Sequence, residues 1–416
     1  MSKRRGTVAT IDVGSTKVVV LVADVGEFGE TRVLGVGVTP AAGLSRGAID
    51  NIESAREAIR NAVAKAEQSC GMRILSATVG ISGNHIQSQN NRGIIAVADR
   101  NNAITPDDRL RVLEAASQIA IPPNREVIHN IPSGYWIEGS HPVSDPVGMF
   151  GGRVDAQVHI VTAAVSSLQN LTKCVEGAGV QVDDMVLGPL AASHAVLEEQ
   201  ERIQGAALVD IGGSATSVCV FDEGYLAHSS CLPLAGTHIT QDIARVLRCP
   251  WESAESLKRD HGTAASSPAM NGQSVEIQTF GTKGTREVAL THIAEIVQAR
   301  VEEILEAIAI ELKRTGYLER IAAGLVLCGG TSELKGLPEF AEARLGLPVR
   351  VGYPRGYSGL NELIDTPAYA TALGLADFAL GDRDRVAESA TPGLGQRYGS
   401  GILRRLADFG RALMPE

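Results

Sequence analysis

The 416-residue sequence lacks several features that would point to particular classes of protein. It has no run of 18 apolar residues, so no segment is predicted to cross a bilayer. Its six cysteines lie far apart without a C-x-x-C pair, which favours reduced core thiols in a cytoplasmic protein over disulfides or a metal site. A formal net charge of −10 argues against nucleic acid as a partner. With 4% aromatic residues and 45 glycines, the composition is typical of an α/β protein with many tight turns.

The stretch Ala207–Phe221 (ALVDIGGSATSVCVF) contains the strongest local motif. Its two apolar runs predict two strands joined by a tight turn, with Asp210 at the end of the first strand. Glycines let a backbone approach an anion, and consecutive amides can surround its oxygens, while a carboxylate at the strand end can hold a hydrated Mg²⁺. The motif therefore suits the phosphates of a nucleotide.

A similar motif occurs near the N-terminus, at Ala9–Asp24 (ATIDVGSTKVVVLVAD). Each hairpin alone is compatible with Asp and Gly serving as ordinary turn residues. Two such motifs, about 200 residues apart, instead predict two related halves that grip one nucleotide.

Hydrophobic periodicity predicts several helices around these hairpins. They are expected at Asp50–Cys70, Ser167–Ala178, Gly188–Glu201, Gly236–Leu247, Trp251–Arg259, Arg286–Arg314 and Pro367–Leu380. The polar stretch Gly262–Arg286 is expected to be a hairpin. From Gly83 to about Thr162 the pattern changes to an α+β insertion, in which Thr105 and Pro106 begin a helix.

The C-terminal end has a different character. Residues Gly381–Ser400 have no apolar period and are expected to be a flexible linker. The final segment, Gly401–Glu416, regains a helical period with an apolar face flanked by arginines, which suits a helix lying in the headgroup plane of an anionic membrane. The alternative is a helix packed on the protein's own core. The residues expected to contact lipid are Ile402, Leu403, Arg404, Arg405, Leu406, Phe409, Arg411 and Leu413.

Taken together, these motifs resemble the FtsA family of bacterial, actin-like cell-division proteins. The resemblance covers nearly the whole chain and rests on the paired hairpins, the amphipathic end and four further segments. These are Ile81–Val97 (ISGNHIQSQNNRGIIAV), the step Gly148–Met149, Ala254–Gly262 (AESLKRDHG) and Val326–Leu337 (VLCGGTSELKGL).

The resemblance implies an actin-like (ribonuclease H-like) two-lobed ATPase fold with an inserted α+β subdomain and a C-terminal amphipathic helix. One lobe would comprise residues 1–82, 163–204 and about 360–380, and the other residues 205–228 and 321–359. Residues 83–162 would form a self-assembly subdomain, 229–320 a partner-binding subdomain, 381–400 the linker and 401–416 the membrane-targeting helix.

The family's nucleotide site, carried over position by position, implies ATP and Mg²⁺ as ligands. Asp12 and Asp210 would hold the metal through water, and Glu255 and Lys258 would hold the ribose. The full set of expected contact residues is Asp12, Gly14, Ser15, Thr16, Lys17, Asp210, Gly212, Gly213, Ser214, Thr216, Gly236, Glu255, Lys258, Gly329, Gly330 and Thr331.

One position departs from the wider superfamily. Many actin-fold hydrolases carry Glu or Gln before the proline that corresponds to Pro189, and that side chain orients the attacking water. Here Gly188 occupies the position. Glycine can neither accept a proton nor hold a water, so the sequence predicts ATP binding with slow or negligible hydrolysis.

The resemblance also implies partners and a location. The protein would assemble at midcell on the cytoplasmic face of the inner membrane, self-associate, bind the C-terminal peptide of the tubulin-like FtsZ and recruit later division proteins. Arg286, Arg300 and Glu303, on the predicted long helix, are the candidate contacts for that peptide. The alternatives are a small-molecule kinase of the same fold, which would need a further catalytic carboxylate, and an actin-fold scaffold of a pilus or another membrane machine.

Overall fold

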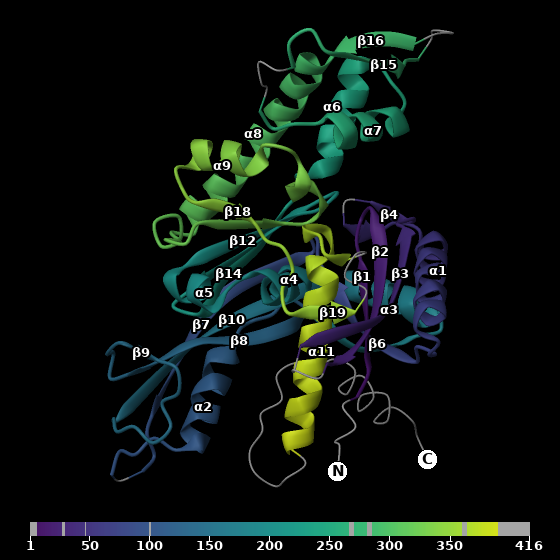
Figure 1. Cartoon of the computed structure of the whole chain (residues 1–416). Helices are drawn as coiled ribbons and strands as arrows, with labels where there is room; N and C mark the ends of the chain where they lie inside the picture. Colours follow the sequence, from purple (N-terminus) through teal and green to yellow (C-terminus); the bar gives the residue numbers. More distant parts are fainter. Residues whose placement is uncertain are drawn as a thin grey trace.

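The computed structural model describes residues 6–26, 30–45, 47–99, 101–265, 270–280, 285–359 and 364–389. The chain forms two lobes, each built on its own sheet, with an inserted subdomain below the second lobe (Figure 1).

The first lobe is built on a six-stranded sheet in the order β11-β6-β1-β2-β3-β19. The hairpin β1–β2 is antiparallel, and β6 pairs with β1 in parallel. The strands are β1 (Val8–Val13), β2 (Lys17–Val25), β3 (Thr31–Pro40), β6 (Ser76–Ile81), β11 (Gln181–Leu187) and β19 (Tyr357–Gly359). A short hairpin of β4 (Leu44–Ser45) and β5 (Ala48–Ile49) follows β3.

Helices cover both faces of this sheet, with α1 and α3 on one side and α4 and α11 on the other (Figure 1). Because both faces are covered, β2 is apolar and buried from Val18 to Ala23 rather than alternating. Asn51 caps the start of α1 and Gly71 ends it in the left-handed conformation. The helices are α1 (Ile52–Cys70), α3 (Val165–Gly177), α4 (Gly188–Val196) and α11 (Ala370–Ser389).

The second lobe repeats the same arrangement in a five-stranded sheet, β14-β13-β12-β17-β18. Its hairpin β12–β13 is antiparallel, and β17 pairs with β12 in parallel, as β6 does with β1. The strands are β12 (Ala206–Ile211), β13 (Thr216–Asp222), β14 (Tyr225–Leu232), β17 (Leu325–Cys328) and β18 (Val349–Val351). The predicted repeat of the hairpin is therefore a repeat of the fold.

Helices and a small hairpin extend the second lobe away from the first (Figure 1). Its long helix α8 buries a continuous stripe that includes Val297, Val301, Ile304 and Ile308. The elements are α5 (Glu199–Gln204), α6 (Gly236–Leu247), α7 (Trp251–His261), β15 (Ser274–Gln278), β16 (Thr285–Ala289), α8 (Leu290–Arg314), η2 (Gly330–Glu333), α9 (Leu337–Leu345) and, before α11, η3 (Pro367–Tyr369).

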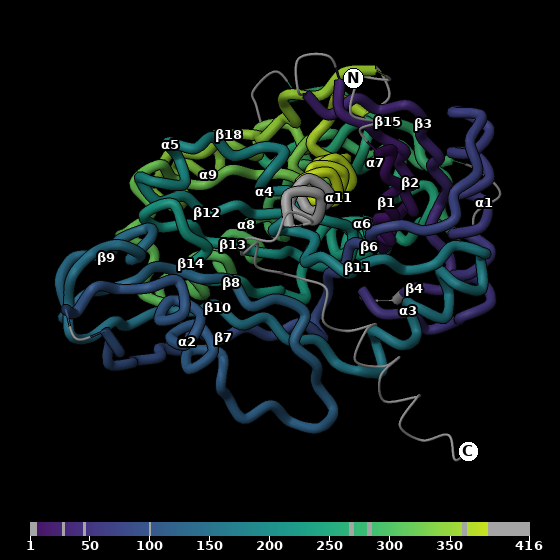
Figure 2. Tube along the Cα trace, turned by 90° about the horizontal axis from the view of Figure 1, so that it is seen from below, coloured from purple at the N-terminus to yellow at the C-terminus, as the bar shows by residue number. Residues whose placement is uncertain are grey.

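The insertion has its own four-stranded sheet, β7-β10-β8-β9, with helix α2 packed on one face. Its strands are β7 (Ile86–Ala96), β8 (Arg125–Ile137), β9 (Pro142–Val143) and β10 (Arg153–Ala164), and α2 is Pro106–Ser117. The predicted start of α2 is confirmed, since Thr105 and Asp108 form a capping box ahead of Pro106. Figure 2 shows the insertion on the side of the molecule opposite α1.

The insertion is docked on β14 through hydrogen bonds to main-chain carbonyls. Ser88 Oγ donates to Ser229 O (2.5 Å), Asn90 Nδ2 to Ala227 O (2.8 Å) and Ser133 Oγ to Leu226 O (3.0 Å).

Three predicted boundaries are wrong. The long helix begins at Leu290 rather than Arg286, because residues 285–289 pair with β15. The helix predicted over Gly188–Glu201 is two helices, α4 and α5. The last helix continues to Ser389, so residues 381–389 are helical rather than a linker. The remaining linker residues and the whole predicted membrane helix lie outside the described residues.

In the part of the chain that the structure describes, no helix combines the length and the apolar character that crossing a membrane requires.

Candidate functional site

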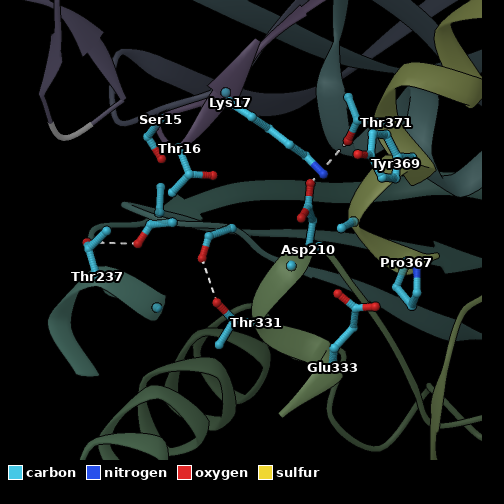
Figure 3. A pocket seen from close by; sticks show the side chains of 18 of the residues that line it. Ser15, Thr16, Lys17, Asp210, Thr237, Thr331, Glu333, Pro367, Tyr369 and Thr371 are labelled. Atoms are coloured by element: carbon cyan, nitrogen blue, oxygen red, sulfur yellow. Dashed lines mark hydrogen bonds between the residues drawn. The ribbon is translucent and has the colours of Figure 1, made fainter. Parts of the chain in front are cut away.

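A cleft of about 700 Å³ lies between the two lobes and is lined by both hairpin turns (Figure 3). Fourteen of the sixteen predicted contact residues line it; Ser214 and Thr216 do not. The fourteen are Asp12, Gly14, Ser15, Thr16, Lys17, Asp210, Gly212, Gly213, Gly236, Glu255, Lys258, Gly329, Gly330 and Thr331. The structure therefore gathers residues from three distant parts of the chain at one cavity.

The two hairpin turns have the same internal hydrogen bond and contact one another. Gly14 N donates to Lys17 O (3.0 Å), and Gly212 N donates to Ala215 O (3.1 Å). A Cβ added at Gly213 would lie 2.5 Å from Thr16 Cγ2, so this position accepts only glycine without movement. The two turns are thus held face to face by close packing.

The two predicted residues that do not line the cleft have other partners. Ser214 contributes its main chain, since its amide donates to Ser15 Oγ at 3.0 Å. Thr216 is fully buried, and its hydroxyl donates to Leu234 O at 2.6 Å. Thr216 therefore supports the turn from behind.

Asp12 and Asp210 are the carboxylates that the two hairpins place in the cleft. Burial, together with the neighbouring Asp210, raises the pKa of Asp12 to about 7. Burial raises the pKa of Asp210 to about 6, although the Thr371 hydroxyl, 3.3 Å from Asp210 Oδ2, and Lys17 oppose the rise. Both carboxylates are thus desolvated and close enough to interact.

This donor set fits a hydrated Mg²⁺. Mg²⁺ prefers oxygen ligands and keeps several of its waters, so it is usually held by one or two carboxylates together with phosphate oxygens. A divalent cation between Asp12 and Asp210 would also offset their mutual repulsion, which is visible in the raised pKa of Asp12.

The Gly329 turn closes another side of the cleft. Gly329 has φ of 81°, and a Cβ there would lie 2.3 Å from Asp210 Oδ1, so both the conformation and the space require glycine. Thr331 Oγ1 donates to Gly212 O at 2.9 Å, which joins this turn to the second hairpin. Gly236 approaches the same hydroxyl, because a Cβ added there would be 2.2 Å from Thr331 Oγ1.

Glu255 and Lys258 lie on α7 at the wall of the cleft. Lys258 Nζ is 2.7 Å from Glu255 Oε2 and 2.8 Å from Thr240 Oγ1, and it also donates to Gly236 O at 3.3 Å. These contacts fix both side chains beside the glycine at the start of α6. Their placement in the cleft is compatible with the expected contact to a sugar, although the same pair is also an i,i+3 helix pair.

Several lining residues were missed by the sequence analysis. Thr237 Oγ1 donates to Gly213 O (2.8 Å), and the Lys17 Nζ lies 3.5 Å from the centroid of the Tyr369 ring. Glu333, Tyr369 and Thr371 also face the cleft (Figure 3). Tyr369 and Thr371 lie within the helix expected at Pro367–Leu380, and nothing in that segment resembles a phosphate-binding pattern.

Gly188, the position without a water-orienting side chain, is buried at the start of α4. A Cβ there would lie 2.2 Å from Ser82 Oγ and 3.4 Å from Thr371 Cγ2, both of which belong to residues that line the cleft. The space next to Gly188 is therefore filled by Ser82 and Thr371.

The candidate partner residues are divided between two elements. Arg286 lies on β16 and not on the long helix, so its predicted place is wrong. Arg300 lies on α8, where its guanidinium bonds Asp242 of α6 (2.6 and 3.0 Å) and Glu303 (2.6 Å). Of these two α8 residues Glu303 is the more exposed: 58% of its side chain is accessible to solvent, against 21% for Arg300.

Two repeated sheets around one glycine-lined cleft define an actin-like fold, and solved structures of that class share the architecture. A PilM–PilN type IV pilus biogenesis complex matches with a TM-score of 0.65 at 17% identity, over 90% of this chain and 99% of that chain. MreB5 of Spiroplasma citri bound to AMPPNP matches with a TM-score of 0.58 at 13% identity, over 93% and 100%.

Sequence comparison is more specific. The family model described as Cell division protein FtsA matches residues 207–374, and that of the SHS2 domain inserted in FTSA matches residues 83–162. The FtsA of Pseudomonas aeruginosa is 41% identical over 89% of this chain and 88% of its own length. That of Neisseria meningitidis is 35% identical over 98% of both, and that of Escherichia coli is 32% identical over 90% of both. The chain belongs to the FtsA family of cell-division proteins.

Proposed function

We propose that the cleft binds ATP with Mg²⁺. The observation that carries the proposal is the contact between two glycine turns, each preceded by a strand whose next-to-last residue is a desolvated aspartate. In that arrangement Ser15 and Gly213 present hydroxyl and main-chain groups to phosphates, and Asp12 and Asp210 hold the hydrated metal. The nucleotide in the related fold of MreB5, AMPPNP, is an ATP analogue and supports this choice of ligand.

Calorimetry of the full chain with a non-hydrolysable ATP analogue and Mg²⁺ tests this proposal. Uptake of one nucleotide is expected, and Asp210→Ala should weaken it by at least tenfold, because the metal loses one of two carboxylates. Asp50→Ala removes an exposed carboxylate elsewhere and should change nothing. An absence of heat with the unmodified protein contradicts the proposal.

The nucleotide serves to fix the two lobes rather than to be consumed rapidly. Gly188 supplies no base, and Ser82 and Thr371 occupy the neighbouring space, so the chemistry of water activation lacks a dedicated side chain. Turnover by the protein alone should be well below about 1 per second, the lower end of ordinary enzymes. A phosphate-release assay that reaches this rate contradicts slow turnover.

The protein then acts in cell division as a membrane adaptor. ATP sets the relative angle of the lobes, polymers of the chain form through surfaces that include the insertion, and the segment 401–416 anchors them to anionic lipid at the cytoplasmic side of the inner membrane, at midcell. The amphipathic sequence of that segment supports the anchor. Many weak anchors on one polymer would bind strongly together.

The partner proposed for the second lobe is the C-terminal peptide of FtsZ, with other division proteins recruited later. Membership of the FtsA family supports this choice. The kinase alternative has less support, because the cleft's buried carboxylates, Asp12 and Asp210, are both assigned to the metal. The pilus alternative rests on likeness of fold at 17% identity, whereas the FtsA relatives reach 41%.

A further inference from the structure

Lys17 is a cation placed among acids. It is the first residue of β2, immediately after the first hairpin turn, and its side chain reaches toward Asp210, Tyr369 and Thr371 (Figure 3). Asp12, Glu333 and Asp210 all favour its charged form, whereas burial lowers its pKa. A lysine has a flexible four-carbon stem and can turn toward any of these acids.

The ammonium nevertheless lies on an aromatic face. Lys17 Nζ is 3.5 Å from the centroid of the Tyr369 ring, and no carboxylate among the described residues forms an ion pair with it. A cation over an aromatic ring is attracted by the negative face of the ring. The ring therefore competes with the acids for the ammonium.

Tyr369 is itself held in place by the other walls of the cleft. It ends η3, and its amide donates to Thr366 O at 3.0 Å. Two residues before it, Pro367 O accepts from Gly329 N at 3.0 Å, and two residues after it the Thr371 hydroxyl donates to Asp210. The segment 367–371 thus contacts the second hairpin, the Gly329 turn and the ammonium of Lys17 in the first hairpin.

We propose that Tyr369 is a positioning residue, whose ring holds the Lys17 ammonium for the nucleotide phosphates and keeps it from pairing with Asp12 and Asp210. This inference rests on the proposed binding of Mg²⁺ and ATP. Without the ring, Lys17 pairs with an acid of the cleft, so the phosphates lose a cation and the metal loses a charged ligand.

The first experiment needs no nucleotide. Lys17 in the full chain is labelled with limiting acetic anhydride across a pH series, and mass spectrometry gives the midpoint of its reactivity. In Tyr369→Leu this midpoint should move to higher pH, because an ion pair with Asp12 or Asp210 favours the charged ammonium. Tyr369→Phe, which keeps the ring, should match the unmodified protein. Tyr353→Leu, at a tyrosine with 52% exposure, is the matched control.

The second experiment measures affinity for Mg²⁺ and a non-hydrolysable ATP analogue by calorimetry. Tyr369→Leu should bind about 2- to 30-fold more weakly, the range expected for a lost cation–π contact, and Tyr369→Phe should bind normally. In a Lys17→Met background, Tyr369→Leu should have no further effect, because the ring acts through Lys17. Should Tyr369→Leu fail to fold, Tyr369→Met takes its place.

The outcomes are separable. An unchanged labelling midpoint in Tyr369→Leu overturns the inference, and so does an equal loss of affinity with and without Lys17. If Tyr369→Phe is as damaging as Tyr369→Leu, the hydroxyl and not the ring is what matters, which also overturns it. If the unmodified protein takes up no nucleotide, the proposed function fails, and the labelling experiment alone decides whether Tyr369 holds Lys17.

Discussion

The amide of Ser214 donates a 3.0 Å hydrogen bond to Ser15 Oγ and so joins two turns that lie 199 residues apart in the sequence. Each turn belongs to a different lobe, and neither is rigidly attached to the other by a strand or helix at this point. The relative position of the two turns at the cleft therefore depends on single hydrogen bonds and close packing contacts. A small change in one turn should displace the other.

Gly213→Ala should separate the turns. The new Cβ would lie 2.5 Å from Thr16 Cγ2 and 2.7 Å from Ser15 Oγ. Overpacking of this kind costs about 1–3 kcal/mol, so affinity for ATP with Mg²⁺ should fall by about tenfold or more in calorimetry. Adding Thr16→Ser removes the nearer methyl and should restore part of the loss.

The matched control for that substitution is Gly381→Ala, where a Cβ meets nothing within 4 Å. Because alanine is the better helix former, this variant should keep its affinity and gain slightly in thermal stability. Equal affinities of Gly213→Ala and the unmodified protein would show that the contact does not shape the site.

The carboxylate pair predicts how stability depends on pH in the absence of nucleotide and metal. In the folded chain the pKa of Asp12 is about 7 and that of Asp210 about 6, against 3.8 for an ordinary aspartate. Folding favours the protonated forms of both aspartates. The stabilisation that results is fully present below pH 3.8 and is lost as the pH rises through about 6 and 7.

The melting temperature, followed from about pH 5 to pH 8, should fall less steeply in Asp12→Asn than in the unmodified protein, because the amide has no proton to lose. Asp12→Asn should also be the more stable of the two at the upper end of that range. Asp50→Asn makes the same chemical change at an exposed position and should leave the slope unaltered. Parallel curves for all three proteins contradict the raised pKa of Asp12.

Deleting residues 401–416 should abolish sedimentation with liposomes that contain anionic lipid. Leu406→Glu should act like the deletion, since it places a charge in the middle of the apolar face that the sequence predicts. The same substitution at Leu75, which is 69% exposed on the folded lobe, serves as its control and should not change the bound fraction. A membrane fraction that survives the deletion refutes the anchor.

The α8 surface predicts a charge-dependent partner contact. Glu303→Lys reverses an exposed charge, whereas Arg300→Glu would also break the bonds to Asp242 and so disturb folding. In fluorescence anisotropy with a labelled FtsZ C-terminal peptide, Glu303→Lys should change the affinity severalfold, as a single interfacial charge does. Glu319→Lys, just beyond the helix, should not. Identical affinities would place the peptide elsewhere.

The doubled hairpin could be predicted from sequence because its information is local. An apolar run, an acid and glycines within fifteen residues suffice to specify a strand, a turn and a second strand, and α6 likewise has the predicted bounds Gly236–Leu247. Eight of the fourteen cleft residues lie in these two hairpins, whereas Gly236, Glu255, Lys258 and the turn at Gly329–Thr331 were expected from the resemblance to the FtsA family.

The predictions failed where contacts with segments distant in the sequence determine the local structure. The long helix was expected to begin at Arg286, but residues 285–289 extend as a strand because they pair with β15, where Val275 lies opposite Val288 and Ile277 opposite Arg286. Residues 381–400 were expected to be a linker because they have no apolar period, yet the last helix continues through Gly381 to Ser389. Tyr369 and Thr371 reach the cleft because α11 begins beside Asp210, a placement that no spacing between them and the hairpins can show.

The insertion's attachment has a consequence for divergence within the family. Ser88, Asn90 and Ser133 all bond the carbonyls of β14 and not its side chains, so what they recognise is the path of a strand. Most side chains along β14 can therefore change without weakening this attachment; the exceptions are Ser229, whose hydroxyl is 2.9 Å from His159 Nε2 of the insertion, and Cys231, whose Sγ is 3.4 Å from Asn84 Oδ1. Insertions exchanged between distant relatives should therefore dock as well as the native one, provided that they keep these three polar side chains and His159, and that β14 keeps Ser229.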